Sequence, residues 1–262
     1  MRAVSRPAAR KELGQHFLVD ENIVRVAGRL AELGPEDVVL EIGPGLGVLT
    51  AFLADHVRLV HAVELDRSLE PALRERLGNR TNVELVFGDA LRVPLHELDP
   101  PPGKLVANLP YNVATPLVVE SLDGLPTVER WCVMVQREVA DRFFAEPGTR
   151  AYGAVSVLLR LTAERTGFHP VPPSVFRPRP NVDSALVAFR RMRTWGPEYA
   201  PLKRVVQAGF AHRRKTLANS LALAGLDRAR ADEAVAAAGL DRAVRAVALE
   251  PETFLALAER LA

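Results

Sequence analysis

The sequence predicts an α/β fold with a mostly parallel, doubly wound sheet, followed by a small all-α domain at the C-terminal end. Two observations predict this architecture. Short apolar runs alternate with helical segments over the first 146 residues, which is typical of right-handed βαβ units in a sheet covered on both faces. Beyond residue 195, apolar residues recur at helical spacing only. We therefore expect one domain over residues 1–195 and a helical domain over residues 196–262.

The expected strands of the first domain are short, apolar and rich in β-branched residues, and several end in glycine or an acidic residue. Helices are expected where apolar residues recur three or four positions apart. Asp20 is placed to cap the first helix, and Gly78 follows the third. In chain order the segments are helix 20–33, strand 37–42, helix 48–56, strand 57–66, helix 68–78, strand 82–90, strand 103–111, helix 115–122, strand 131–136 and helix 137–146.

The chain changes character from about residue 163. Residues 168–182, FHPVPPSVFRPRPNV, are rich in proline and therefore cannot form an α-helix. Residues 184–191 alternate between apolar and other residues like a strand. The remaining expected helices are 200–211, 215–225, 228–239 and 251–262.

Composition excludes several classes of protein. No apolar run approaches the roughly 18 residues that cross a membrane, and the basic N-terminus lacks the apolar core of a secretory signal. We therefore expect a cytoplasmic, monomeric protein without a membrane anchor. The single cysteine, Cys132, excludes an intramolecular disulfide and is expected to be buried, since it lies in the apolar run RWCVMVQ. The histidines lack metal-ligand spacing and there is no CxxC, so no metal site is expected.

Positive charge is concentrated in segments, although the net charge is only +2. Residues 203–215 carry five Lys or Arg and no acid, and residues 176–193 carry five Arg against one Asp. Arg2, Arg6, Arg10 and Lys11 form a third basic segment. Basic segments on a nearly neutral chain indicate a side that faces a polyanion, although each segment alone is also typical of a solvated surface.

Small and acidic residues follow three consecutive expected strands. In an open α/β sheet, ligands bind beyond the carboxyl ends of the strands. The first strand leads into GPGLG, where Gly43 and Gly45 let the backbone approach a ligand. The second ends at Glu64, which is placed to bind the two hydroxyls of a ribose, and the third ends at Asp89, which is placed to accept from an adenine amino group. Each acid alone is often only a cap, but together they indicate an adenosine-containing cofactor.

The glycine spacing separates two such cofactors. The pattern G-x-G-x-x-G would require a third glycine at position 48, which is Val48, whereas the next glycine is Gly47. A nicotinamide-dependent oxidoreductase is therefore disfavoured. S-adenosylmethionine fits better, because it has no pyrophosphate for a helix N-terminus to hold.

The fourth expected strand ends in the tetrapeptide NLPY. The Asn108 amide oxygen and a backbone carbonyl near Leu109 and Pro110 are placed to accept hydrogen bonds from an adenine amine, whose lone pair is otherwise delocalised. Pro110 fixes the turn, and Tyr111 is placed to stack on the base. Such a site needs no strong base, since positioning and desolvation supply most of the rate.

These motifs resemble the small-subunit ribosomal RNA adenine N6,N6-dimethyltransferases (the KsgA family). The resemblance implies a Rossmann-like class I methyltransferase fold, S-adenosylmethionine as the cofactor, and a pair of adjacent adenines in a hairpin near the 3′ end of 16S rRNA as the target. It covers nearly the whole chain in order, through segments 11–20, 41–50, 63–66, 88–91, 108–117, 135–142, 152–159, 175–189 and 210–221.

The resemblance also implies roles for individual residues. Asn108, Leu109, Pro110 and Tyr111 would hold the target adenine, and Phe176 would close the other side of the base. The family often has Asn at the position of His16, and either side chain can form a hydrogen bond. The cofactor site would comprise His16, Leu18, Gly43, Gly45, Glu64, Asp89, Ala90 and Asn108. RNA phosphates would be bound by Arg177, Arg179, Arg213, Arg214 and Lys215, with the N-terminal arginines.

Two further alternatives stay open. The macrolide-resistance methyltransferases of large-subunit (23S) rRNA, the Erm group, share the fold, the cofactor loop and an Asn-x-Pro-Tyr tip. A non-catalytic ribosome assembly factor would keep the fold without the chemistry. The segments FAHRRKTLANSL and RPRPNVDSALV look more like the small-subunit group, and the intact strand-tip motifs favour an enzyme.

Overall fold

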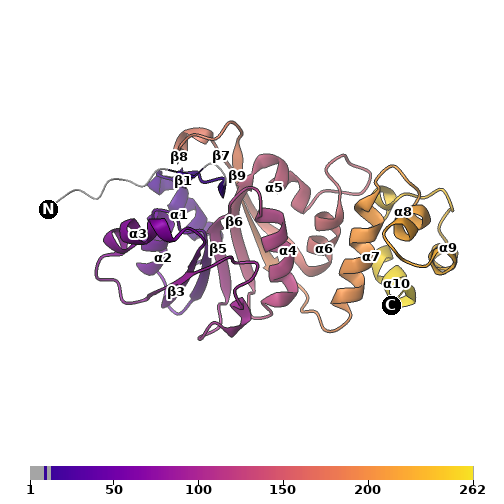
Figure 1. Cartoon of the computed structure of the whole chain (residues 1–262), viewed down its shortest axis with the longest axis horizontal. Coiled ribbons are helices and arrows are strands. Elements are labelled where there is room, and N and C mark those ends of the chain that lie inside the picture. Colours follow the sequence, from indigo (N-terminus) through magenta and orange to yellow (C-terminus); the bar gives the residue numbers. More distant parts are fainter. Residues whose placement is uncertain (1–8, 11–12, 262) are drawn as a thin grey trace. The chain divides into compact units, whose positions relative to one another are not determined.

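The computed structural model describes residues 9–10 and 13–261, which form two compact units (Figure 1). The first unit contains the described residues up to Ala140 and Arg165–Arg191. The second contains Asp141–Glu164 and the described residues from Met192 onward.

The first unit is built on a mostly parallel sheet, as predicted. Its strands are β2 (Val38–Ile42), β3 (Leu59–Glu64), β4 (Val83–Phe87), β5 (Lys104–Asn108), β6 (Arg130–Gln136), β7 (Ala163–Val171) and β9 (Ser184–Arg191). Their order in the seven-stranded sheet is β4-β3-β2-β5-β6-β9-β7. Neighbours from β4 to β6 pair in parallel, and β9 pairs antiparallel with β6. A separate two-stranded ladder joins β1 (Phe17–Leu18) to β8 (Phe176–Arg177).

Helices pack their apolar faces against this sheet. Ile23 and Val24 of the first helix and Leu53 of the second belong to the same buried cluster as Val39 and Val60 of the strands. Asp20 caps the first helix as predicted, because its side chain accepts from the backbone N–H groups of the first turn. The helices are α1 (Glu21–Leu30), α2 (Val48–Ala54), α3 (Glu70–Leu77), α4 (Ala114–Gly124) and α5 (Arg137–Phe143).

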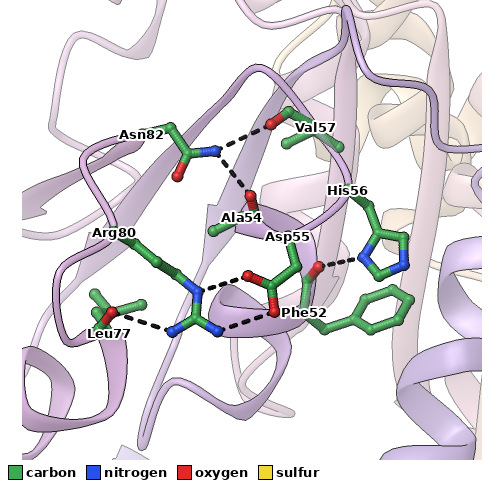
Figure 2. A network of polar contacts seen from close by, with 8 residues as sticks. All are labelled: Phe52, Ala54, Asp55, His56, Val57, Leu77, Arg80 and Asn82. Atoms are coloured by element: carbon green, nitrogen blue, oxygen red, sulfur yellow. Dashed lines mark hydrogen bonds and ion pairs between the residues drawn. The ribbon is translucent and has the colours of Figure 1, made fainter.

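A polar network fixes the amino ends of β3 and β4 (Figure 2). The Asn82 amide donates to the carbonyls of Ala54 and Val57, at 2.8 and 3.0 Å. The Arg80 guanidinium donates to both oxygens of Asp55, at 2.8 and 2.9 Å, and this hydrogen bonding lowers the pKa of Asp55. The chain before β4 is thereby tied to the end of α2, which helps to set the register that places the carboxyl ends of β2, β3 and β4 at one edge.

The sequence did not predict β7. Pro170 lies near its end, and proline interrupts the backbone ladder of a central strand. The structure accommodates it because β7 is the last strand in the sheet order, so one of its edges has no partner in the described sheet. The Pro-rich segment contains no α-helix, as predicted, only a 3₁₀ turn over Pro173–Val175.

The second unit is helical. Helix α7 contacts α6, α8 and α10, and the rings of Phe210 and Phe254 stack with centroids 5.7 Å apart. The Tyr152 hydroxyl donates to the carbonyl of Leu249 at 2.7 Å. The helices are α6 (Ala154–Thr162), α7 (Tyr199–Ala211), α8 (Leu217–Leu223), α9 (Arg228–Ala237) and α10 (Pro251–Leu261).

The two compact units differ from the predicted domains in one segment. The sequence placed a single boundary near residue 195, and the chain does pass into the helical unit at Met192. Residues 141–164 also belong to that unit, because α6 packs its apolar face on α7 and α10. Proximity along the chain does not reveal such a long-range contact.

Cys132 is fully buried in β6, as the sequence indicated, and burial raises the pKa of its thiol to about 12. Within the described ranges, no helix combines the length and hydrophobicity that a membrane span requires. The same residues form no cluster of three or more His, Cys, Asp or Glu that would hold a metal ion.

Candidate active site

A pocket lies beyond the carboxyl ends of β2, β3, β4 and β5, where the sequence placed a ligand. Its cavity volume is about 200 Å³, and it is open to solvent on one side. The N-terminal segment 13–18 supplies one wall and the turn 108–113 supplies another. The predicted residues that line it are His16, Leu18, Gly43, Gly45, Glu64, Asp89, Asn108, Leu109, Pro110 and Tyr111.

The glycine turn after β2 owes its shape to left-handed backbone. Gly45 has a φ of +59°, and a Cβ there would lie 2.9 Å from a ring carbon of Phe17. Its N–H donates to the Glu64 carboxylate at 3.0 Å. Only glycine tolerates both the positive φ and the close approach of the Phe17 ring, so this position of the turn requires glycine.

We expect Gly45→Ala to weaken binding of an adenosine-containing cofactor by about tenfold, which corresponds to about 1.4 kcal/mol. The added methyl group would displace Phe17 and strain the backbone. Calorimetric titration with S-adenosylmethionine checks this. Gly239→Ala is the matched control, because Gly239 has a φ of +69° and open space around it. Equal affinity of the Gly45→Ala and unmodified proteins would contradict the structural account of this turn.

Glu64 holds the turn in place. Its two carboxylate oxygens accept from the N–H groups of Gly45 and Asp66, at 3.0 and 2.9 Å. Burial raises the pKa of Glu64, while these hydrogen bonds oppose the rise. The Asp66 side chain accepts from Ser68 and Gln15 and lies outside the pocket wall. The carboxylate of Glu64 therefore combines a structural role with a place in the pocket.

Asp89 lies at the tip of β4. Its Oδ1 accepts from the N–H of Leu91 at 3.0 Å, its Oδ2 lies 3.5 Å from Arg92 Nε, and its side chain is 42% exposed. It therefore keeps acceptor capacity toward the pocket. Ala90, predicted beside it, instead lines a neighbouring cavity together with Leu95 and Leu117. The structure does not bring Ala90 to the main pocket.

The Asn108 side chain has a defined orientation. Its Nδ2 donates to the backbone carbonyl of His16 at 3.2 Å. Because a carbonyl only accepts, the amide nitrogen must face His16, and Oδ1 remains an acceptor. The sequence predicted this acceptor, but not the residue that orients it.

The two backbone carbonyls in the turn after Asn108 differ in whether they already accept a hydrogen bond. The carbonyl of Pro110 accepts from the N–H of Val113 at 3.1 Å. The N–H of Leu109 donates to Met134, while the Leu109 carbonyl has no hydrogen bond within the described part of the chain. Leu109 is therefore the better second acceptor of the two that the sequence left open.

The Tyr111 ring is held from two sides. Its hydroxyl lies 2.6 Å from Ser184 Oγ, and its ring lies 5.5 Å from the His16 imidazole at an angle of 30°. His16 Nδ1 donates to the carbonyl of Pro178 at 2.8 Å, which fixes the imidazole in turn. Burial raises the pKa of Tyr111, so its hydroxyl stays neutral at physiological pH. The result is a fixed aromatic platform in the pocket wall.

Phe176 does not reach the pocket. It pairs with Leu18 across the β1–β8 ladder, and its ring is fully buried in the apolar cluster beneath the sheet. The sequence motif placed it near the base, but the ladder directs its side chain into the core. Phe176 thus supports β1, and the residues of β1 and of the segment before it line the pocket.

The basic residues divide between the two units. Arg177 and Arg179 are exposed on the first unit, and Arg177 also donates to the carbonyls of Ser174 and Phe176. On the second unit, Arg213, Arg214 and Lys215 are all exposed, and Arg213 also donates to the carbonyls of Tyr152 and Arg150. Arg2, Arg6 and Lys11 lie outside the described residues, while Arg10 lies 3.7 Å from Asp66.

Several pocket residues were not predicted. Gln15, Phe17 and Leu69 line the wall; the first two lie in segment 11–20, which the resemblance covers, but the sequence analysis assigned them no role. Glu41 also lines it, although it is buried within β2. A lone acid in the otherwise apolar run VVLEI was the signal available for Glu41.

The charge of the wall indicates what it can hold. Among the described lining residues, Glu41, Glu64 and Asp89 carry carboxyl groups, and none is Lys or Arg. Such a wall is unsuited to a pyrophosphate. It suits a ligand with positive charge and an uncharged adenosine part, so the residues present fit S-adenosylmethionine.

Comparisons with known proteins agree with this geometry. A family model described as ribosomal RNA adenine dimethylase matches residues 6–262. The chain is 48% identical over 255 residues to ribosomal RNA small subunit methyltransferase A of Rubrobacter xylanophilus, covering 97% of this chain and 96% of that protein. It is 42% identical over 265 residues to the protein of the same name from Moorella thermoacetica, covering 96% and 92%.

Solved structures are similar over the same length. A dimethyladenosine transferase from Plasmodium falciparum matches with a TM-score of 0.75 and 22% identity, covering 92% of this chain and 96% of that chain. The 23S rRNA methyltransferase ErmE matches with a TM-score of 0.66 and 32% identity, covering 94% and 99%. These matches and the strand order confirm the predicted Rossmann-like class I methyltransferase fold.

Proposed function

Because the chain belongs to the ribosomal RNA adenine dimethylase family, we propose that it transfers methyl groups to N6 of two adjacent adenines near the 3′ end of 16S rRNA, giving N6,N6-dimethyladenine. The observation that carries the proposal is the pair of free acceptors, Asn108 Oδ1 and the Leu109 carbonyl, at the edge of an acidic pocket. The enzyme would act as a cytoplasmic monomer on the small ribosomal subunit.

S-adenosylmethionine would bind in the pocket described above. When bound, it supplies an electrophilic methyl group on a sulfonium. The glycine turn at Gly43 and Gly45 would lie against it, with Glu64 on the ribose side and Asp89 on the adenine side. His16, Leu18 and Asn108 would complete the wall.

The turn at 108–111 would prepare the nucleophile. Asn108 and Leu109 would accept the two N6 hydrogens, which favours a tetrahedral amine with an available lone pair. Tyr111 would stack on the base, and its hydroxyl is already occupied by Ser184. No side chain is required as a strong base, since the acceleration comes from positioning and desolvation.

The target bases must leave their stack to reach this turn. Unstacking costs a few kcal/mol in a duplex and less in a hairpin loop. A loop substrate is therefore consistent with a pocket at the edge of the sheet.

The test uses radiolabelled S-adenosylmethionine, the purified protein, and separately isolated small and large ribosomal subunits that lack the modification. We expect label in small-subunit rRNA, recovered as N6,N6-dimethyladenine. Label in the large subunit would overturn the substrate assignment and favour the activity named for ErmE, to which the chain is 32% identical. Binding to the small subunit without label in either would indicate an assembly factor.

We expect RNA binding to weaken steeply with salt, because Lys and Arg release counterions from phosphates. The double variant Arg214→Ala/Lys215→Ala removes two exposed charges of the second unit. It should reduce the slope of log affinity against log salt by about 1.5. The control, Arg29→Ala/Arg58→Ala, removes the same charge from exposed positions of the first unit. Equal slopes for the two double variants, measured by filter binding, would contradict this role.

A further inference from the structure

Glu41 is a buried carboxyl group that the proposed methyl transfer does not use. It lies in β2 between Leu40 and Ile42 and is only 1% exposed, yet it lines the cofactor pocket. Its Oε2 has no hydrogen-bond partner within the described part of the chain. The neighbouring Thr50 hydroxyl is buried and lacks a partner of normal geometry as well. A buried carboxylate without a hydrogen-bond partner is unfavourable, so this group favours either a proton or a positively charged ligand.

The groups around Glu41 offer it no positive charge. On β3, Glu64 is a second carboxyl group, and its proximity disfavours charge on Glu41. On α2, Thr50 is neutral, and on β5 the nearest pocket residue is the amide of Asn108. His16, Asp89 and Tyr111 are the remaining titratable side chains among the described lining residues. Burial is the largest influence and raises the pKa of Glu41 to about 8.

We propose that Glu41 carries a proton while the pocket is empty and releases it to solvent when the cationic cofactor binds, so that cofactor binding is coupled to proton release. The inference rests on the proposed function, because it requires S-adenosylmethionine as the ligand. A positive charge entering the pocket compensates the buried carboxylate, and the O–H bond breaks with the proton leaving to water. Glu64 does not need to change, since two backbone N–H groups already stabilise its charge.

The compensating charge has two chemical sources. S-adenosylmethionine carries a sulfonium and an amino-acid ammonium group, whereas the product S-adenosylhomocysteine retains only the ammonium. If the sulfonium is the partner, Glu41 favours the methyl donor over the spent cofactor. If the ammonium is the partner, both ligands release the proton equally.

The experiment is isothermal titration calorimetry of the full-length protein at pH 7, in buffers with different ionisation enthalpies. We expect close to one proton released per S-adenosylmethionine bound. Affinity should rise about tenfold per pH unit up to about pH 8 and then level off, as linkage requires for one proton. This pH series tests the proposal in the unmodified protein, whatever the behaviour of any variant.

Two variants identify the source of the proton. Glu41→Gln removes the titrating group while keeping its shape, and should bind the cofactor without proton release. Glu36→Gln removes an exposed carboxyl from the loop before the same strand and should release the proton normally.

The proton counts for S-adenosylmethionine and S-adenosylhomocysteine distinguish the possible results. Proton release with both ligands, lost in Glu41→Gln, supports the proposal with the ammonium as partner; release with the methyl donor alone supports it with the sulfonium. Binding without proton release, or release that persists in Glu41→Gln, overturns the inference and leaves the proposed function standing. Failure to bind S-adenosylmethionine at all would overturn both.

Discussion

Asn108→Ala will lower the rate of methyl transfer by about a hundred- to a thousandfold, the range found when one donor or acceptor is removed from a preorganised site. The variant loses the acceptor Oδ1, and it also loses the bond from Nδ2 to the carbonyl of His16. The amine of the target base is then held by the Leu109 carbonyl alone. The effect should fall on kcat more than on cofactor affinity, because the group acts on the reacting nitrogen.

Asn108→Asp separates the two functions of this side chain. The aspartate keeps an acceptor for the amine but cannot donate to the carbonyl of His16, so its activity should fall between those of the alanine variant and the unmodified protein. Asn22→Ala, on the exposed face of α1, is the control for loss of an amide and should be fully active. Single-turnover methylation of the small subunit measures all three variants. Full activity of Asn108→Ala would refute the amine-binding role.

Local features of the site were predictable from the sequence. Glycines, acids and the NLPY turn follow short apolar runs, and a parallel sheet brings such ends to one edge whatever the exact packing. That general rule was sufficient to place Gly45, Glu64 and Asn108 around one pocket. Their partners were less accessible, because the bonds from Asn108 to His16 and from Tyr111 to Ser184 join residues 92 and 73 positions apart.

Tertiary contacts explain what the sequence did not predict. Arg213 lies in a basic run expected to bind RNA, and the sequence did not indicate that its guanidinium also donates to carbonyls of Arg150 and Tyr152. Phe176 follows a motif linked to base binding, yet the β1–β8 ladder buries its ring. Pro170 lies in a segment for which the sequence predicted no strand, and β7 tolerates this proline because it is the last strand in the sheet order. Each outcome depends on a segment distant in the chain.

Glu41→Gln will change how the stability of the cofactor-free protein depends on pH. The pKa of Glu41 rises from 4.5 to about 8 in the folded state. Below about pH 4.5 both folded and unfolded states hold the proton, so the carboxyl behaves like an amide. Between about pH 4.5 and 8 the unfolded chain loses its proton while the folded state keeps it, and stability falls as pH rises. Above about pH 8 both states are ionised and the loss is complete.

Glutamine does not titrate, and every other titratable group is common to both proteins. The difference between their free energies of unfolding therefore reports on Glu41 alone. We expect similar free energies of unfolding near pH 4.5, and an advantage for Glu41→Gln that grows to about 4 kcal/mol at pH 9. Urea denaturation at intervals between these values measures the difference, with Glu36→Gln as the exposed control. A constant difference across the range would mean that Glu41 is ionised in the folded, empty pocket. The cofactor would then meet a preformed carboxylate, and no proton would be available for release on binding.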